Sequence, residues 1–416
     1  MRLLFRHAWK FVVAVNILLL LSGAQPRAGV TLASPGPAPI LLVVNDAYAG
    51  NKFGRYLGEI LRAEGLPSFD AIDLSALTAA ELSQHDLAIL AETPLTSAQA
   101  SALTTYVSGG GRLLALRPDA QIKNLFDLGA SAGTLTDGYL KIIDTAALNG
   151  NLPGQGLVTA TLQIHGGTDR YTPLGGAVVL ARLYSNASTS TTYPAVVSGF
   201  TGRSIAFTYD LSRNVILTRQ GNPANGNVDV DGDGVLRTID LFQTVGNPGA
   251  PWVDRNRIAV PQADEQQRLF ARLVKQLVGE ARPLPQLWYF PGTAKTMLIL
   301  TADAHANPQS YYQTEIDSIN AYGGKVTFYL STGGGILNNA VMQSWRAQGH
   351  EFGIHPYRNP DLAGGYNASE GTFAFYYSSP KSRTVRNHQV AWLGWTTNCS
   401  QRSPARRAPR SPARAR

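Results

Sequence analysis

The chain has 416 residues, of which 44% are apolar and 15% charged, a composition typical of a globular protein with about two or three domains. Its formal charge of +8 arises at the two ends: residues 1–24 hold three basic side chains, residues 401–416 hold six Arg, and neither segment holds an acidic residue. The body between them is nearly neutral, so we predict no nucleic-acid partner. Cys399 is the only cysteine, which excludes an internal disulfide framework and a thiolate-rich zinc site.

Residues 1–24 have the pattern of an export signal, with basic residues before an apolar run at 11–21 and small residues after it. A membrane-spanning helix needs about 20 apolar residues, so this run is too short for a permanent anchor. We therefore expect cleavage near residue 24 and no transmembrane span in the mature chain. The protein is expected in the periplasm, at the cell surface or in the medium. Residues 25–39 are rich in Pro, Gly and Ala and predict a linker.

From residue 40 the chain alternates short apolar runs with segments of helical spacing. Ser97 is the expected cap of the second helix, and the Gly-Gly-Gly sequence at 109–111 is its expected end. Such alternation predicts a parallel sheet covered by helices on both faces. The expected strands are 40–44, 69–73, 87–90 and 112–116, and the expected helices are 53–64 and 97–107.

Residues 40–130 resemble the flavodoxin-like parallel sheet of glutamine-amidotransferase-like domains, through this alternation and the Gly-Gly-Gly-Arg turn before the fourth strand. That family uses a nucleophilic cysteine, and Cys399 lies far along the chain, so the resemblance implies a non-catalytic domain. Strand-like runs separated by Gly, Asn, Ser and Thr predict a β-rich completion of the same domain, which would span residues 40–282. These runs are 157–162, 177–180, 195–197 and 204–207.

An acidic segment interrupts this β-rich part. Asp229, Asp231 and Asp233 occupy positions 1, 3 and 5 of a twelve-residue calcium loop, Gly234 occupies position 6, and Asp240 occupies position 12. The segment resembles an EF-hand or dockerin-type loop, and the resemblance implies a structural Ca²⁺. The alternative interpretation is an acidic surface turn, because the preceding residues are rich in Gly and Asn and no second copy exists.

After the Arg-Pro-Leu-Pro sequence at 282–285, which indicates a domain boundary, the alternation of strands and helices resumes. Asp303 follows the first strand of this region and His355 follows the third. Side chains at the ends of neighbouring parallel strands converge on one mouth of the sheet, where α/β enzymes place metal and acid–base groups. The expected strands are 297–300, 326–330 and 351–354, and the expected helices are 311–321 and 340–347. A helix is also expected at 264–277, before the boundary.

Residues 294–395 resemble the first half of the NodB-homology polysaccharide deacetylases, and the resemblance implies a partial, distorted (β/α) barrel. The first motif of that family, Thr-Phe-Asp-Asp-Gly, corresponds to Thr-Ala-Asp-Ala-His at 301–305. Asp303 matches the catalytic base. Ala304 stands where the family has a metal-binding Asp, and His305 is the candidate that replaces it.

The second and third motifs of the family also have counterparts. Gly-His-Glu-Phe-Gly at 349–353 precedes His355, which matches the first metal-binding His, whereas Asn359 replaces the second. In the sequence Arg-Thr-Val-Arg-Asn-His, Arg386 matches the residue that orients the catalytic Asp, and His388 is a further candidate ligand. The later motifs, including the His that protonates the leaving amine, have no counterpart.

This set implies a divalent metal, most simply Zn²⁺, that activates water while Asp303 accepts its proton. The resemblance implies hydrolysis of N-acetyl groups on a cell-wall or extracellular polysaccharide or peptidoglycan, and the missing acid leaves open whether the chain is active. The alternative is a non-catalytic carbohydrate-binding or accessory protein, which Ala304 and Asn359 favour. Hydrolysis of another C–N bond is a third interpretation.

The last residues break the pattern. Residues 396–416 are dominated by Arg, Ser, Pro and Ala, and they have no apolar periodicity. We predict a disordered basic tail, and we interpret the abrupt change within a βα unit as a truncated or out-of-register end.

Overall fold

A computed structural model describes residues 36–244, 247–331, 337–357, 361–377 and 384–392. The predicted signal, most of the predicted linker, Asn359 and the predicted basic tail lie outside these residues. Contacts divide the chain into Met1–Ala38 and Pro39–Arg416, and every element below belongs to the second unit. Among the described residues, no helix has the length and apolar character needed to cross a membrane.

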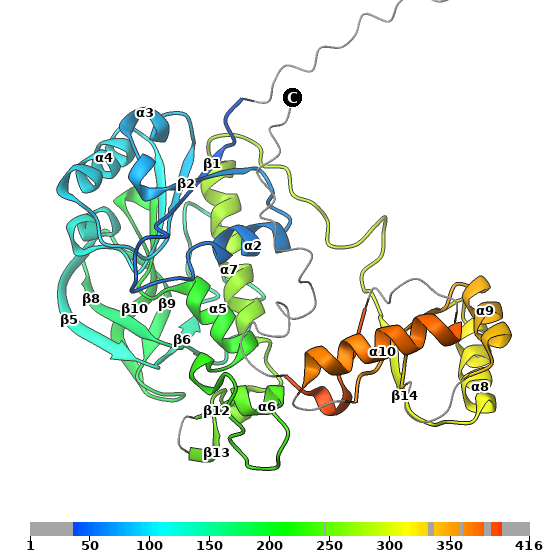
Figure 1. The fold of residues 1–416 in the computed structure, drawn as a ribbon. Coiled ribbons are helices and arrows are strands. Elements are labelled where there is room, and N and C mark those ends of the chain that lie inside the picture. The colour runs from blue at the N-terminus through cyan, green and yellow to red at the C-terminus, as the bar shows by residue number, and fades with distance from the viewer. Residues whose placement is uncertain (1–35, 245–246, 332–336, 358–360, 378–383, 393–416) are drawn as a thin grey trace, which may run out of the picture. The chain divides into compact units, whose positions relative to one another are not determined.

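A nine-stranded sheet forms the first domain (Figure 1). Five of its strands are parallel, in the order β2-β1-β3-β4-β11, which is the 2-1-3-4-5 order of a flavodoxin-like sheet. The predicted fold class is therefore confirmed for this part. The bounds are β1 (Ile40–Val44), β2 (Phe69–Asp73), β3 (Leu87–Leu90), β4 (Arg112–Leu116) and β11 (Ser204–Phe207).

The sheet continues past β11 with antiparallel strands, so the β-rich segment completes one sheet. These strands are β10 (Ser190–Gly199), β9 (Val178–Tyr184), β6 (Tyr139–Ile142) and β7 (Leu162–Gln163). Two separate antiparallel pairs accompany it. They are β5 (Leu128–Thr136) with β8 (Gly167–Pro173), and β12 (Gln243–Thr244) with β13 (Asn247–Pro251).

Two apolar cores lie on opposite faces of this sheet. Along β1, Ile40, Leu42 and Val44 join one core, and Leu41 and Val43 join the other, because successive side chains of a strand alternate between faces. The first core contains side chains of α2 (Tyr56–Ala63), α5 (Leu211–Gln220) and α7 (Gln262–Gly279). The second contains side chains of α3 (Ala79–Leu82) and α4 (Ser97–Ser108). A further helix, α6 (Thr238–Leu241), overlaps the end of the acidic loop.

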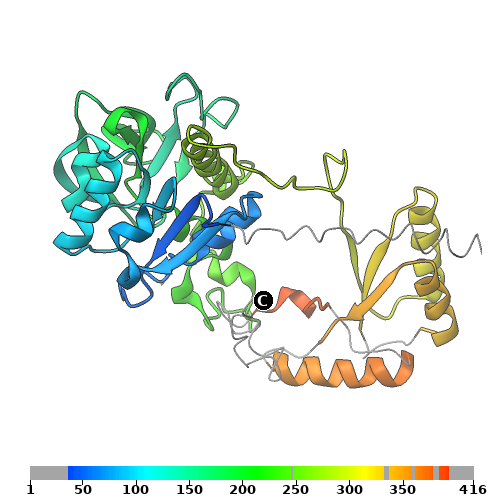
Figure 2. The ribbon, with the colours of Figure 1, turned by 90° about the horizontal axis from the view of Figure 1, so that it is seen from above.

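The C-terminal part contains three parallel strands in chain order, each followed by a helix (Figure 2). Its core holds side chains of all three helices, including Ile316 and Trp345, together with Phe328 and Phe352 of the strands. Asp303 is exposed and lies on the other side of its strand from Ala302 and Ala304, which contact this core. The elements are β14 (Leu300–Ala304), α8 (Gln309–Asn320), β15 (Val326–Leu330), α9 (Asn339–Ala347), β16 (Glu351–Ile354) and α10 (Leu362–Tyr377).

Some predicted boundaries are wrong. The strand expected at 297–300 begins at Leu300, because Leu300 pairs with Val326, the first residue of β15, and residues 297–299 have no partner strand. Of the run at 157–162, only its last residue lies in a strand. The cap of α4 is Thr96 rather than Ser97, since the Thr96 hydroxyl accepts a hydrogen bond from the backbone N–H of Gln99.

Candidate metal centre

His355 lies directly after β16, and its ring is fixed by one hydrogen bond. The Nδ1–H donates to the backbone carbonyl of Arg386 at 2.7 Å, and the residue is only 1% exposed. The Nε2 atom is buried and has no hydrogen-bond partner among the described residues. A ligating His typically donates one ring N–H to such a carbonyl and leaves the other nitrogen for the metal. The orphaned Nε2 therefore fits a cation.

Three imidazoles meet at this place. His305 follows β14, His388 lies on the segment that returns beside the end of β16, and one nitrogen from each of the three rings lies within 4.8 Å of the others. The ring centroids are 5.2 Å apart for His305 and His355, 5.6 Å for His305 and His388, and 5.5 Å for His355 and His388. The structure thus brings together all three residues that the sequence suggested as zinc-type ligands, and they could hold one ion.

Electrostatics favour neutral rings in this cluster. Burial lowers the pKa of His355, although the hydrogen bond to Arg386 and the carboxylate of Asp303 oppose the shift. Burial and the nearby His305 lower the pKa of His388. A metal binds the neutral imidazole, so these shifts favour the protonation state that a ligand requires.

Asp303 and Arg386 also lie together, as the resemblance implied. The Nη2 atom of Arg386 is 3.6 Å from Oδ1 of Asp303, and both side chains are 41% exposed. A half-exposed pair of this kind adds little stability. Asp303 lies near enough to both His355 and His388 to act on their pKa values.

Sequence reasoning missed Tyr357. Its hydroxyl is hydrogen-bonded to Nδ1 of His305, and its ring stacks on His388 with centroids 3.9 Å apart and planes at 14°. A usable signal was present, because residues two apart on an extended segment share a side and Tyr357 follows His355 by two. His350, at the other end of β16, has a structural role: Nδ1 accepts from the backbone N–H of Val326 at 3.3 Å.

The acidic loop brings together three of its four predicted ligands. Carboxylate oxygens of Asp229, Asp231 and Asp240 lie within 4.8 Å of one another, whereas Asp233 pairs with Arg237. Asp240 is 2% exposed and accepts from the backbone N–H groups of Val230 at 3.0 Å and Arg237 at 2.7 Å. The position-5 residue of the motif thus lies outside this group of carboxylates.

An ion-pair cluster that the sequence did not suggest occupies the carboxyl ends of the parallel strands of the first domain. Arg117, directly after β4, donates to Glu92 at 2.9 Å and to both oxygens of Asp169 at 3.0 and 3.1 Å. Asp210 is 3% exposed, caps α5, and accepts from Asn51 at 2.8 Å. Ligands of open α/β sheets bind at these strand ends. Here charged side chains pair with one another at that position, which supports a structural role.

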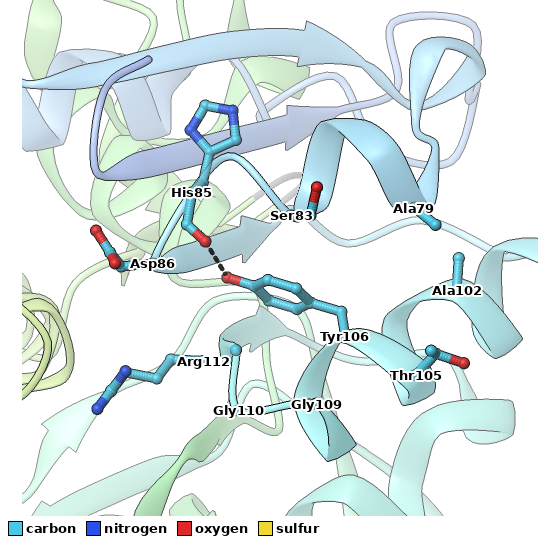
Figure 3. A pocket seen from close by; sticks show the side chains of 11 residues that line it. Ala79, Ser83, His85, Asp86, Ala102, Thr105, Tyr106, Gly109, Gly110 and Arg112 are labelled. Carbon is cyan, nitrogen blue, oxygen red and sulfur yellow. Dashed lines mark hydrogen bonds between the residues drawn. The ribbon is translucent and has the colours of Figure 1, made fainter. Parts of the chain in front are cut away.

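A hollow of about 380 Å³ opens at the other edge of the same sheet, near the amino ends of β3 and β4 (Figure 3). Tyr106 points into it and donates from its hydroxyl to the backbone carbonyl of His85 at 3.0 Å. Burial raises the pKa of Tyr106 to about 12. Because this is the edge opposite to the usual ligand site, we assign the hollow no function.

No protein-family model and no curated protein matches the chain. Among solved structures, α-L-fucosidase isoenzyme 2 from Paenibacillus thiaminolyticus is 15% identical, covering 60% of this chain and 34% of its own, with a TM-score of 0.37. PurLQS from Thermotoga maritima is 13% identical over 58% of this chain and 100% of its own, with a TM-score of 0.35. Exo-β-1,4-mannosidase Op5Man5 from Opitutaceae bacterium strain TAV5 is 15% identical over 43% of this chain and 32% of its own, with a TM-score of 0.30. The chain thus spans about a third of the two glycosidases, and likenesses this weak support no functional argument.

Proposed function

We propose that the protein is an exported, metal-dependent deacetylase of the NodB-homology type, which hydrolyses N-acetyl groups on a cell-wall or extracellular glycan. The observation that supports the proposal best is the orphaned Nε2 of His355, which faces two further imidazoles beside the paired Asp303 and Arg386. The motif resemblance supplies the reaction class, and the site geometry is compatible with it.

The residues have distinct parts in this proposal. His305, His355 and His388 would hold Zn²⁺, for which three imidazoles and an open position are a suitable catalytic set. When bound, such an ion lowers the pKa of a coordinated water to about 7. Asp303 would accept the proton of that water, and Arg386 would hold the Asp303 carboxylate in place.

The exposure of the centre suits a large substrate. The side chain of Asp303 is 41% exposed and Tyr357 is 43% exposed, so groups on the polymer can approach them from solvent. Aromatic faces such as that of Tyr357 offer an apolar surface against which a sugar ring can pack.

The second metal of the proposal is a structural Ca²⁺ in the acidic loop. Asp229, Asp231 and Asp240 supply carboxylates, and Gly234 has a φ of +83°, as the sharp turn at position 6 requires. Asp240 is buried and lies in the first turn of α6, so an ion bound there would join the loop to this helix.

Zinc content tests the main proposal. Purified mature chain, starting at residue 25, should bind one Zn²⁺, and His355→Ala should lose it. His350→Ala is the matched control, because His350 is similarly buried and flanks the same strand at its opposite end. Acetate release from N-acetylglucosamine oligomers then tests the reaction. Zinc binding that persists unchanged in His355→Ala would overturn the assignment.

The accessory-protein alternative rests on Ala304, which occupies the position of a family metal ligand. It predicts a protein that is metal-free after purification in zinc-containing buffer and still retains N-acetylated glycan on an affinity gel. The enzyme predicts bound zinc together with acetate release, so one purified sample distinguishes the two.

A further inference from the structure

We propose that Tyr357 is a positioning residue of the metal centre, which orients His305 through its hydroxyl and His388 through its ring. The inference rests on the proposed function, because it presumes that the three imidazoles bind a divalent cation. The ring of Tyr357 contacts all three imidazoles, at centroid distances of 5.4 Å to His305, 5.5 Å to His355 and 3.9 Å to His388.

The hydroxyl acts on His305. His355 is oriented by a buried backbone carbonyl, whereas His305 is exposed and has the Tyr357 hydroxyl at its Nδ1. When the Nδ1–H of His305 donates to this oxygen, Nε2 carries the free lone pair and the ring is held in one orientation. Partners of this kind fix the tautomer of a ligating His and raise its basicity.

The ring acts on His388. The two planes are stacked at 14°, so the imidazole of His388 cannot rotate about its own axis without losing this contact. The backbone of His388 is held separately, since its N–H donates to the carbonyl of Pro356 at 3.1 Å. The hydrogen bond therefore fixes the main chain of His388, and the stacking fixes the orientation of its ring.

The two actions can be separated by substitution. Tyr357→Phe removes the hydroxyl and keeps the stacked ring, so only His305 loses its partner. Tyr357→Ala removes both. We expect zinc affinity to fall about 10-fold in Tyr357→Phe and about 100-fold in Tyr357→Ala, the range found when outer partners of metal ligands are replaced. Tyr322 is 93% exposed and lies in the turn after α8, so Tyr322→Ala is the matched control and should bind zinc as the wild type does.

The experiment is a competition titration of the mature chain with Zn²⁺ against a chromophoric chelator, with thermal melting of each variant as a check on folding. NMR of the imidazole nitrogens in the metal-free protein supplies a second readout, which a purely structural role would not change. The wild type and Tyr322→Ala should show His305 as a single Nδ1–H tautomer, and Tyr357→Phe should show a mixture.

The outcomes separate this inference from the proposed function. A wild type that binds no Zn²⁺ overturns the metal centre itself, and the positioning role with it. A wild type that binds Zn²⁺, together with a folded Tyr357→Ala of unchanged affinity, overturns the positioning role and leaves the centre standing. Equal losses of zinc affinity in Tyr357→Phe and Tyr322→Phe would also contradict the positioning role, because the Tyr322 side chain is exposed to solvent.

Discussion

The Nδ1–H of His355 donates to the backbone carbonyl of Arg386 at 2.7 Å, while the Arg386 side chain reaches Asp303 at 3.6 Å. One residue thus contacts a candidate metal ligand through its main chain and the candidate base through its guanidinium. Substitution of the side chain leaves the carbonyl in place, so the two actions can be tested separately.

Arg386→Ala is expected to keep zinc affinity within about threefold and to lower the rate of acetate release about 10- to 100-fold, the range for a lost outer partner. The reason is that the carboxylate of Asp303 loses its orienting cation, whereas His355 keeps its hydrogen bond. Zinc titration and an acetate assay on the same samples measure both. Loss of zinc from Arg386→Ala would show that the side chain supports the metal ligands after all.

The acidic loop allows a test that the sequence motif alone would not suggest. Asp231→Ala should weaken calcium binding at least about 10-fold, because it removes one carboxylate from the cluster. Asp233→Ala should weaken it less, since Asp233 is paired with Arg237 outside the cluster. Calorimetric titration with calcium compares the two. Equal losses would indicate that Asp233 turns inward when calcium binds.

His165 should make stability depend on pH. It is 3% exposed, stacks on Trp252 at 4.5 Å, and burial lowers its pKa to about 4. As the pH falls, His165 is protonated in the unfolded chain before it is protonated in the folded protein. Its contribution to the free energy of unfolding is therefore present above pH 6.5 and is lost as the pH falls towards 4, by about 3 kcal/mol in total. His165→Phe keeps a stacked ring and should flatten the profile in this window. Urea unfolding across a pH series measures the difference, and parallel profiles would contradict it.

The C-terminal core should depend on Trp345. It is 1% exposed, stacks on Tyr312 and Phe352, and its Nε1–H donates to Gln313 at 2.9 Å. Trp345→Ala should cost about 3–5 kcal/mol of unfolding free energy. Trp288→Ala is the control, because Trp288 is 70% exposed and should change little. Denaturation followed by circular dichroism measures both, and similar small changes would contradict the predicted packing.

Sequence patterns predicted the strands well where local rules suffice. Residues 40–44, 112–116 and 351–354 are short apolar runs bounded by turn residues, and each forms a strand with those limits. These patterns failed where a partner strand decides the outcome. Residues 297–299 are as apolar as a strand, but β15 begins opposite Leu300, so they have no partner. Helix α10 was missed because its Gly-containing sequence lacks an apolar stripe.

The motif resemblance was enough to name His305, His355 and His388 as candidate ligands, and the structure groups them. The convergence of side chains at the ends of parallel strands accounts for His305 and His355. Only the tertiary structure decided which atoms face each other. Three contacts illustrate this: His355 with the carbonyl of Arg386, His305 with the hydroxyl of Tyr357, and Asp233 with the side chain of Arg237. No local sequence pattern encodes the direction of these contacts. Periodicity specifies which face a residue occupies, whereas hydrogen-bond partners follow from how separate segments pack.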